Sequence, residues 1–146
     1  MTLDETVVVA APADVVWQVV TDLPRYGEWN PFVVACRSTL VPGEPIVMRV
    51  RVFRAFAQPQ RELVLEHVAG TRLCYGVAPD RLGALASRRC HHVEPLPDGR
   101  ARYRSHFVLS GWLAPLVQTL LGRRLAAGFQ AMTAALARRA EALAAR

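Results

Sequence analysis

Two side chains suited to acid–base catalysis and anion binding share one face of a predicted strand at residues 87–94. Side chains alternate across a strand, so Arg89, His91 and Val93 point the same way, and the apolar Val93 marks the buried side. A histidine exchanges protons near neutral pH, and an arginine can bind a carboxylate or stabilise an enolate. The pattern predicts that both face a cavity, although a structural His91 bonded to a backbone carbonyl fits it at least as well.

Two tyrosines extend the same predicted inner surface. Tyr75 and Tyr103 lie on the mostly apolar faces of two further predicted strands, at residues 72–77 and 100–109. Each hydroxyl could bond to a ligand carbonyl, but a buried tyrosine usually finds a hydrogen-bond partner within the protein as well. The candidate catalytic residues are therefore His91, Arg89, Tyr75 and Tyr103.

The remaining histidines and one glutamate are less clearly placed. His106 lies on the polar face of its predicted strand, so we expect it in solvent. In the predicted strand at residues 62–68, both faces carry apolar and polar side chains. Either Glu66 or His67 could therefore face the cavity, and the alternation does not decide between them.

Several reaction classes lack the residues they need. The chain has no lysine, so a Schiff base is impossible, and it has no GxGxxG, HExxH or GxSxG motif. The adjacent His91 and His92 point to opposite faces of a strand and cannot chelate one ion, so we expect no metal and no cofactor. The three cysteines, Cys36, Cys74 and Cys90, are odd in number and lack a CxxC spacing, which favours buried free thiols over a disulfide framework.

The composition is that of one globular domain over residues 1–146, with 52% hydrophobic and 21% charged residues. The net charge is +6, but the arginines are scattered, so solvated faces explain them and no nucleic-acid partner is expected. The first residues do not resemble a signal peptide, and no apolar run approaches a membrane span. We expect a cytoplasmic monomer or homodimer without stable membrane insertion.

The predicted elements follow one another in a defined order. A Val-rich strand at residues 6–10 precedes two short helices, one opening after Pro12 and one at residues 23–29. Six strands joined by turns follow, and then one long helical stretch from Trp112 to Ala145. Short turns make neighbouring strands antiparallel, and only the long helix, about 50 Å in length, can cover the apolar face of their sheet. The sequence therefore predicts an α+β fold in which a curved seven-stranded sheet wraps a C-terminal helix.

Three stretches carry a family resemblance. The first is VVVAAPADVVWQVVTDLPRYGEWNPF, the second HHVEPLPDGRARYRSHFVLSG, and the third LAPLVQTLLGRRLAAGFQAMTAALARRAE. They are similar to the opening strand and helices, the last hairpin and the closing helix of the START-like or SRPBCC superfamily, which has the helix-grip fold. The resemblance spans nearly the whole chain and implies a deep cavity between sheet and helix. Members bind lipids, hormones, quinones or polyketides, and some catalyse cyclisation, aromatisation or hydrolysis there.

The apolar ligand contacts are expected on the inner strand faces, at the corner after the second short helix and along the long helix. They are Trp29, Phe32, Met48, Val50, Val52, Leu73, Ser105, Phe107, Trp112, Leu116, Leu120, Phe129 and Met132. Gly128 lies mid-helix, where a glycine costs about 1 kcal/mol relative to alanine, which indicates a close approach by a strand or a ligand. The loop at residues 79–85 is a candidate lid.

Two functions fit this pattern, each with a small hydrophobic partner such as a polyketide, a lipid or a quinone-like molecule. The resemblance favours an enzyme of the polyketide cyclase/dehydrase type, in which the cavity folds a reactive chain and a few polar groups assist proton transfer. The alternative is a carrier or sensor that binds a hydrophobic metabolite without changing it. A protein-interaction module that uses the basic outer face ranks last.

Overall fold

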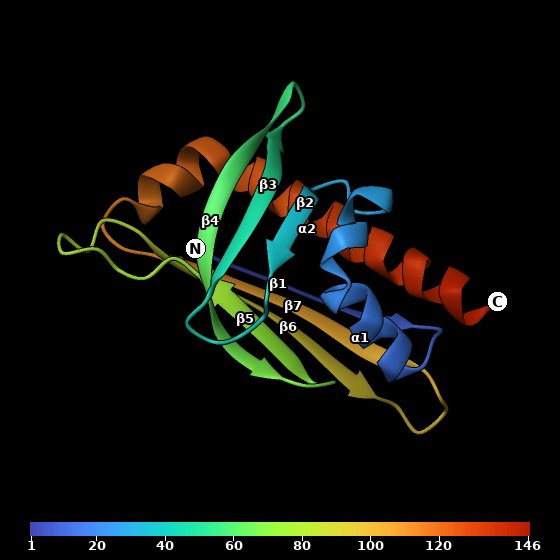
Figure 1. Ribbon diagram of the computed structural model, residues 1–146. Coiled ribbons are helices and arrows are strands. Elements are labelled where there is room, and N and C mark those ends of the chain that lie inside the picture. Colours follow the sequence, from blue (N-terminus) through green and yellow to red (C-terminus); the bar gives the residue numbers. More distant parts are fainter.

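The computed structural model describes all 146 residues, and a single sheet organises them. Its seven antiparallel strands follow the order β1-β7-β6-β5-β4-β3-β2 (Figure 1). They are β1 (Thr2–Val9), β2 (Val33–Ser38), β3 (Pro45–Phe53), β4 (Phe56–Val68), β5 (Arg72–Gly76), β6 (Ala86–Pro95) and β7 (Ala101–Ser110). This confirms the predicted α+β fold and its seven-stranded antiparallel sheet.

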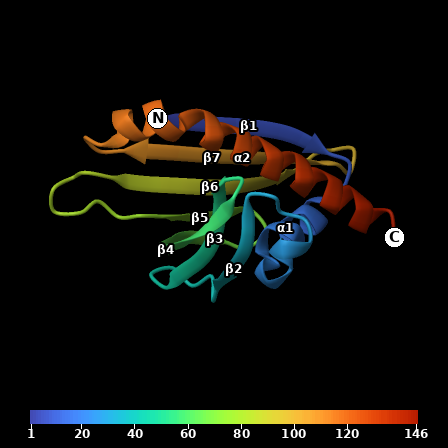
Figure 2. The same ribbon diagram turned by 90° about the horizontal axis from the view of Figure 1, so that it is seen from above.

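Three helical segments accompany the sheet. The short helices α1 (Ala13–Thr21) and η1 (Leu23–Glu28) follow β1 and carry the chain to the far edge, where β2 begins. The long helix α2 (Ala114–Ala144) runs along one face of the sheet, with α1 beside its C-terminal half (Figure 2). Pro115 lies in the first turn of α2, where its missing N–H costs nothing.

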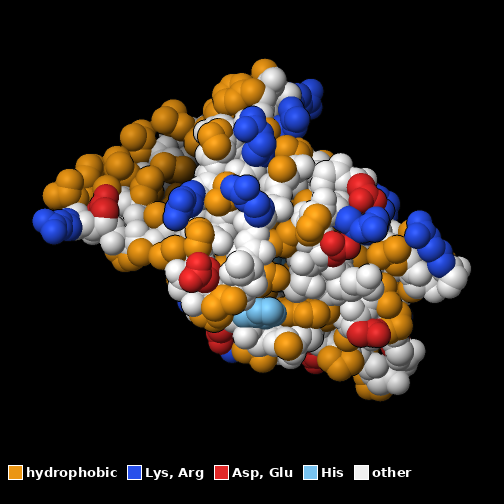
Figure 3. Space-filling view, in the orientation of Figure 1, with side chains coloured by type: hydrophobic (Ala, Val, Ile, Leu, Met, Phe, Trp, Pro, Cys, Tyr) orange, Lys and Arg blue, Asp and Glu red, His pale blue; other side chains and the backbone are white.

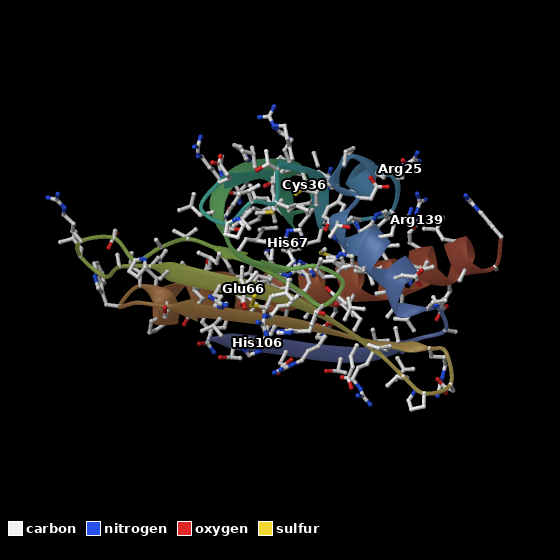
Figure 4. All side chains as sticks on the ribbon, turned by 60° about the horizontal axis from the view of Figure 1, so that its bottom comes forward. Arg25, Cys36, Glu66, His67, His106 and Arg139 are labelled. Carbon is white, nitrogen blue, oxygen red and sulfur yellow. A yellow bond between two sulfur atoms is a disulfide. The ribbon has the colours of Figure 1, made fainter.

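The two halves of α2 have different surroundings. Its C-terminal half packs into the core through Phe129, Met132 and Leu136. On the surface, Arg139 of α2 forms an ion pair with η1, in which its Nη2 donates to Oε1 of Glu28 at 3.1 Å (Figure 4). The N-terminal half contributes few buried residues. The sheet and the helix therefore meet tightly at one end only, and the other end leaves room for a cavity.

Two cysteines contradict the prediction of free thiols. Cys74 and Cys90 lie directly opposite each other on β5 and β6, with Cα atoms 4.1 Å apart, and form a disulfide. Cys36 remains free. An odd cysteine count and a missing CxxC motif say nothing about the register of two strands, and it is the register that brings these two residues together.

Candidate functional site

A cavity of about 290 Å³ lies between the sheet and the N-terminal half of α2. Of its twenty lining residues, fifteen are hydrophobic, so its walls suit an apolar guest. Six of the predicted ligand contacts line it: Phe32, Met48, Val50, Val52, Phe107 and Phe129. From α2 the lining residues include Val117, Leu121 and Leu125, which the sequence analysis did not single out.

The other predicted contacts lie elsewhere. Leu73 and Met132 are fully buried in the core, Ser105 lies beneath Arg89, and Trp29 packs edge-on against Tyr26 with ring centroids 5.1 Å apart. Three more are exposed on the outer side of α2 and its approach, namely Trp112, Leu116 and Leu120. A helix turns about 100° per residue, so the cavity-facing row begins at Val117, one position after Leu116. Leucine spacing alone does not reveal whether the row of residues 116 and 120 or the row of residues 117 and 121 faces the cavity.

Gly128 marks the close approach that its position indicated. A Cβ atom at Gly128 would lie 2.2 Å from the ring of Phe32, whose side chain crosses the helix at this point. The Phe32 ring then meets Phe129 at 5.0 Å and becomes part of the cavity wall. Glycine is thus required here by a neighbouring side chain.

Arg89 supplies the only full positive charge in the cavity wall. The side chain is buried, its Nη2 donates to Ser105 Oγ at 3.2 Å, and its guanidinium lies 4.3 Å over the Phe129 ring. Arg89 takes part in none of the ion pairs of the chain, and its Nε has no hydrogen-bond partner. A buried guanidinium remains charged and is costly without a counter-ion, so Arg89 is well placed to receive an anionic or strongly polar ligand group.

His91 connects the two candidate tyrosines but does not itself line the cavity. Its Nε2 lies 3.0 Å from the Tyr75 hydroxyl, and its Nδ1 lies 2.7 Å from the Tyr103 hydroxyl. Burial, with the nearby Arg89 charge, lowers the pKa of His91 well below its usual range, so the ring is neutral. Burial also raises the pKa of both tyrosines, which remain protonated. Of the three, only Tyr75 reaches the cavity.

Glu62 is the acidic residue that the sequence analysis missed. It lines the cavity and is largely buried, and its Oε1 lies 3.3 Å from the Ser87 hydroxyl and 3.5 Å from Gln60 Nε2. Burial raises the pKa of this carboxyl group above 4.5. A buried carboxyl group with a raised pKa in a cavity wall is a candidate general acid–base.

A register shift in β4, between Val64 and Glu66, settles the two residues whose faces were open. Glu66 points to the outer face, where it pairs with Arg72 and Arg88, and His67 stacks on Trp17 with ring centroids 5.8 Å apart (Figure 4). Neither lines the cavity. The extra residue in the strand reverses the alternation beyond Val64, which period-two patterning cannot detect.

The loop at residues 79–85 lies beside the start of α2. The Trp112 indole donates to the Leu82 carbonyl at 2.9 Å, and Leu85 lines the cavity. Figure 3 shows hydrophobic side chains gathered over this loop and the start of α2, where Leu82 and Trp112 are 77% and 64% exposed. The lid role of this loop stays a prediction.

Comparison with known proteins identifies the family. The sequence model of the family described as "Polyketide cyclase / dehydrase and lipid transport" matches residues 1–141. The chain belongs to this family. Membership in the polyketide cyclase/dehydrase and lipid transport family confirms the START-like resemblance seen in the sequence. A search of curated proteins found no match.

Solved structures share the fold of this family member. A solution structure of a protein from Thermobifida fusca is 26% identical, with a TM-score of 0.68 over 97% of this chain and 94% of that one. The Zhui aromatase/cyclase from Streptomyces sp. R1128 is 18% identical, with a TM-score of 0.71 over 100% and 94%. A START superfamily protein from Mycobacterium smegmatis is 19% identical, with a TM-score of 0.71 over 97% and 98%.

No three His, Cys, Asp or Glu side chains come together as a metal site. None of the helices combines the length and the apolar character that a membrane crossing requires.

Proposed function

We propose that the protein binds a small, mostly apolar molecule in this cavity and acts on it as a cyclase or dehydratase of the polyketide type. The observation that carries the proposal is a buried Arg89 without a carboxylate partner, which lines the same mostly apolar cavity as Tyr75 and Glu62. Such a site places a few polar groups around one end of a guest and excludes water from the rest.

The three polar groups match the steps of an aldol-type ring closure. Glu62, with its raised pKa, removes a proton from a carbon next to a ligand carbonyl, and Arg89 stabilises the enolate oxygen that forms. The enolate carbon then attacks a second carbonyl, whose oxygen accepts a hydrogen bond from Tyr75. Glu62 returns the proton to that oxygen. It then removes a second proton from the attacking carbon and passes it to the new hydroxyl group, which leaves as water while a C=C bond forms. Holding both carbonyls in contact supplies much of the rate.

His91 and Tyr103 are positioning residues in this proposal. A neutral imidazole has one N–H and one acceptor nitrogen. If the buried Tyr103 donates to Nδ1, then Nε2 carries the hydrogen and donates to Tyr75. The Tyr75 O–H is then free to point at a ligand. His91 thus sets the direction of a hydroxyl that touches the guest.

The alternative function is a carrier or sensor of a lipid, quinone or other hydrophobic metabolite. It is favoured by the fifteen hydrophobic lining residues, since an apolar wall and one arginine suffice to hold a fatty or aromatic acid. This function needs no proton transfer, so Glu62 would be dispensable in it.

Native mass spectrometry of the purified protein, followed by a turnover assay of any ligand that co-purifies, separates the two functions. Arg89→Gln should lose the ligand in either case, whereas the neighbouring Arg88→Gln, which points outward toward Glu66, should keep it. Glu62→Gln should retain the ligand but lose turnover if the protein is an enzyme. Unchanged ligand in Arg89→Gln would contradict both functions.

A further inference from the structure

A second hollow, of about 440 Å³, lies between the β3–β4 hairpin and α2. Four arginines line it: Arg51 and Arg54 from the hairpin, and Arg123 and Arg124 from the helix. None of its nine lining residues is acidic. Figure 3 shows arginine side chains and no acidic ones around the hairpin tip. The fold therefore brings together two pairs of arginines that lie far apart in the sequence.

None of these four guanidinium groups has a carboxylate partner, and what sets them apart from the chain's other unpaired arginines is that they line one hollow together. Seven other arginines each have a carboxylate within 4.0 Å. We call this hollow the groove. The contacts made by its arginines involve uncharged partners: Arg51 Nη1 donates to the Arg54 carbonyl at 3.1 Å, and the Arg124 guanidinium lies 5.1 Å over the Phe53 ring. Four clustered like charges repel one another, and an anion that binds between them relieves the repulsion.

The groove adjoins the apolar cavity. Val52 lines both hollows, and Gly128 in the groove touches the Phe32 ring that forms part of the cavity wall. The two hollows are thus neighbours across one wall, and the inference below requires a ligand whose apolar part enters the cavity while its charged part reaches the groove. Arg89 already meets the need of a single carboxylate inside the cavity, whereas four outer arginines match a group with two or more negative charges.

The geometry points to the groove as a binding site for the phosphate or pyrophosphate group of an amphipathic ligand. Planar guanidinium groups bind phosphate oxygens in a bidentate manner, and several together select phosphate over a single carboxylate. This inference rests on the proposed function for the apolar part of the ligand only. The phosphate belongs either to a free phosphorylated molecule or to a phospholipid headgroup.

The test is isothermal titration of the full chain with dodecyl phosphate, dodecanol and inorganic pyrophosphate. The variants are the double substitution Arg123→Gln with Arg124→Gln, and Arg138→Gln as control. Arg138 is exposed on the same helix, has no carboxylate partner and does not line the groove. We expect wild type to bind dodecyl phosphate at least about tenfold more tightly than dodecanol, and the double variant to lose that advantage while Arg138→Gln keeps it.

Each outcome bears on one claim. Equal affinity of wild type for dodecyl phosphate and dodecanol, or equal losses in the double variant and in Arg138→Gln, would overturn the groove site. If neither dodecyl ligand binds, the proposed cavity function fails, and pyrophosphate binding that depends on Arg123 and Arg124 still supports the groove. The groove site is overturned if pyrophosphate does not bind to the wild-type protein.

Vesicles identify the source of the phosphate. Sedimentation of wild type, but not of the double variant, with phosphatidylcholine vesicles that contain phosphatidic acid assigns the group to a lipid headgroup. Binding of dodecyl phosphate without vesicle sedimentation assigns it to a free molecule. Absence of both kinds of binding overturns the inference.

Discussion

The Nδ1 atom of His91 lies 2.7 Å from the hydroxyl oxygen of Tyr103, and both side chains are fully buried. We infer that Tyr103 donates to Nδ1, because a buried hydroxyl that donates to no acceptor costs roughly 1–3 kcal/mol and Tyr75, unlike Tyr103, lines the cavity and can donate to a guest instead. With Tyr103 as the donor to Nδ1, the neutral histidine carries its hydrogen on Nε2, 3.0 Å from the Tyr75 hydroxyl. Tyr103 in the core therefore sets the position of the hydrogen on His91. That position decides whether the Tyr75 hydroxyl, at the cavity wall, accepts a hydrogen bond from His91 or donates one to it.

The first prediction concerns this tautomer. In wild type, the ¹⁵N chemical shifts of His91 should show hydrogen on Nε2 only, because the Tyr103 hydroxyl donates its hydrogen to Nδ1. Tyr103→Phe removes the donor, so the ring should become a mixture of the two tautomers. A wild-type spectrum with hydrogen on Nδ1 would contradict the proposed role of Tyr75 as a donor to the ligand.

The second prediction is a loss of stability in mild acid. Because the pKa of His91 is lowered in the folded state, the unfolded chain binds more protons below its ordinary pKa of 6.5. The stabilisation is present above that pH and declines as the pH falls toward the folded pKa, by up to about 1.4 kcal/mol per pH unit. The raised pKa of Glu62 acts in the opposite direction. Comparison with His91→Gln therefore isolates the histidine.

Urea unfolding at about pH 7.5 and pH 5 measures this effect. The acid-induced loss in wild type should exceed that in His91→Gln. His106→Gln, on the outer face near Asp4, serves as the matched control and should retain the wild-type loss because His91 is intact. Equal losses in wild type and His91→Gln would show that His91 is not buried in neutral form.

The third prediction compares two helical glycines. Gly128→Ala should destabilise the protein by about 1–3 kcal/mol, because its Cβ would overlap the Phe32 ring. Gly122→Ala should stabilise it by up to about 1 kcal/mol, because the nearest atoms are Gln118 Cγ at 3.6 Å and Met1 Sδ at 3.8 Å, at ordinary contact distance. Thermal unfolding of both variants measures whether each substitution raises or lowers the stability relative to wild type. Equal stabilisation by both would mean that Phe32 does not cross the helix at Gly128.

The fourth prediction concerns the disulfide. Under denaturing, non-reducing conditions, a maleimide reagent should label one cysteine, Cys36, and after reduction all three. Reduction should lower the free energy of unfolding by about 3 kcal/mol, since the bond closes a loop of about 15 residues. Cys36→Ser, as control, should abolish labelling of the unreduced chain. Three labelled cysteines before reduction would contradict the bond.

Period-two alternation predicted the strands and the inner position of Arg89 and Tyr75, because each of their strands keeps one register along its length. It left the faces of β4 undecided. Glu62 lies on the cavity side before the register shift, and the shift between Val64 and Glu66 turns Glu66 outward. A register shift depends on the partner strand, so the sequence of one strand does not reveal it. The disulfide was missed for the same reason, since it depends on two strands lying in one particular register.

The long helix shows a different limit. Its length and leucine content predicted that it covers the sheet, and the structure confirms this. Rows of apolar residues at 116 and 120 and at 117 and 121 have the same spacing, however, and lie about 100° apart on the helix. Only the packing of the C-terminal half fixes the rotation of the whole helix. The N-terminal half follows it and turns Val117 and Leu121 to the cavity.

These two rows provide the most direct test of the central claim, that a guest occupies the gap between the sheet and the first half of α2. The measurement is the affinity of the full chain for dodecanoate, an apolar tail with one carboxylate for Arg89, in Val117→Trp and Leu116→Trp. Val117 lines the cavity and Leu116 is 54% exposed outside it, so one variant adds a tryptophan inside the cavity and the other adds it outside. The account predicts at least about a tenfold loss of affinity in Val117→Trp and wild-type affinity in Leu116→Trp. Wild-type affinity in a folded Val117→Trp variant would contradict it.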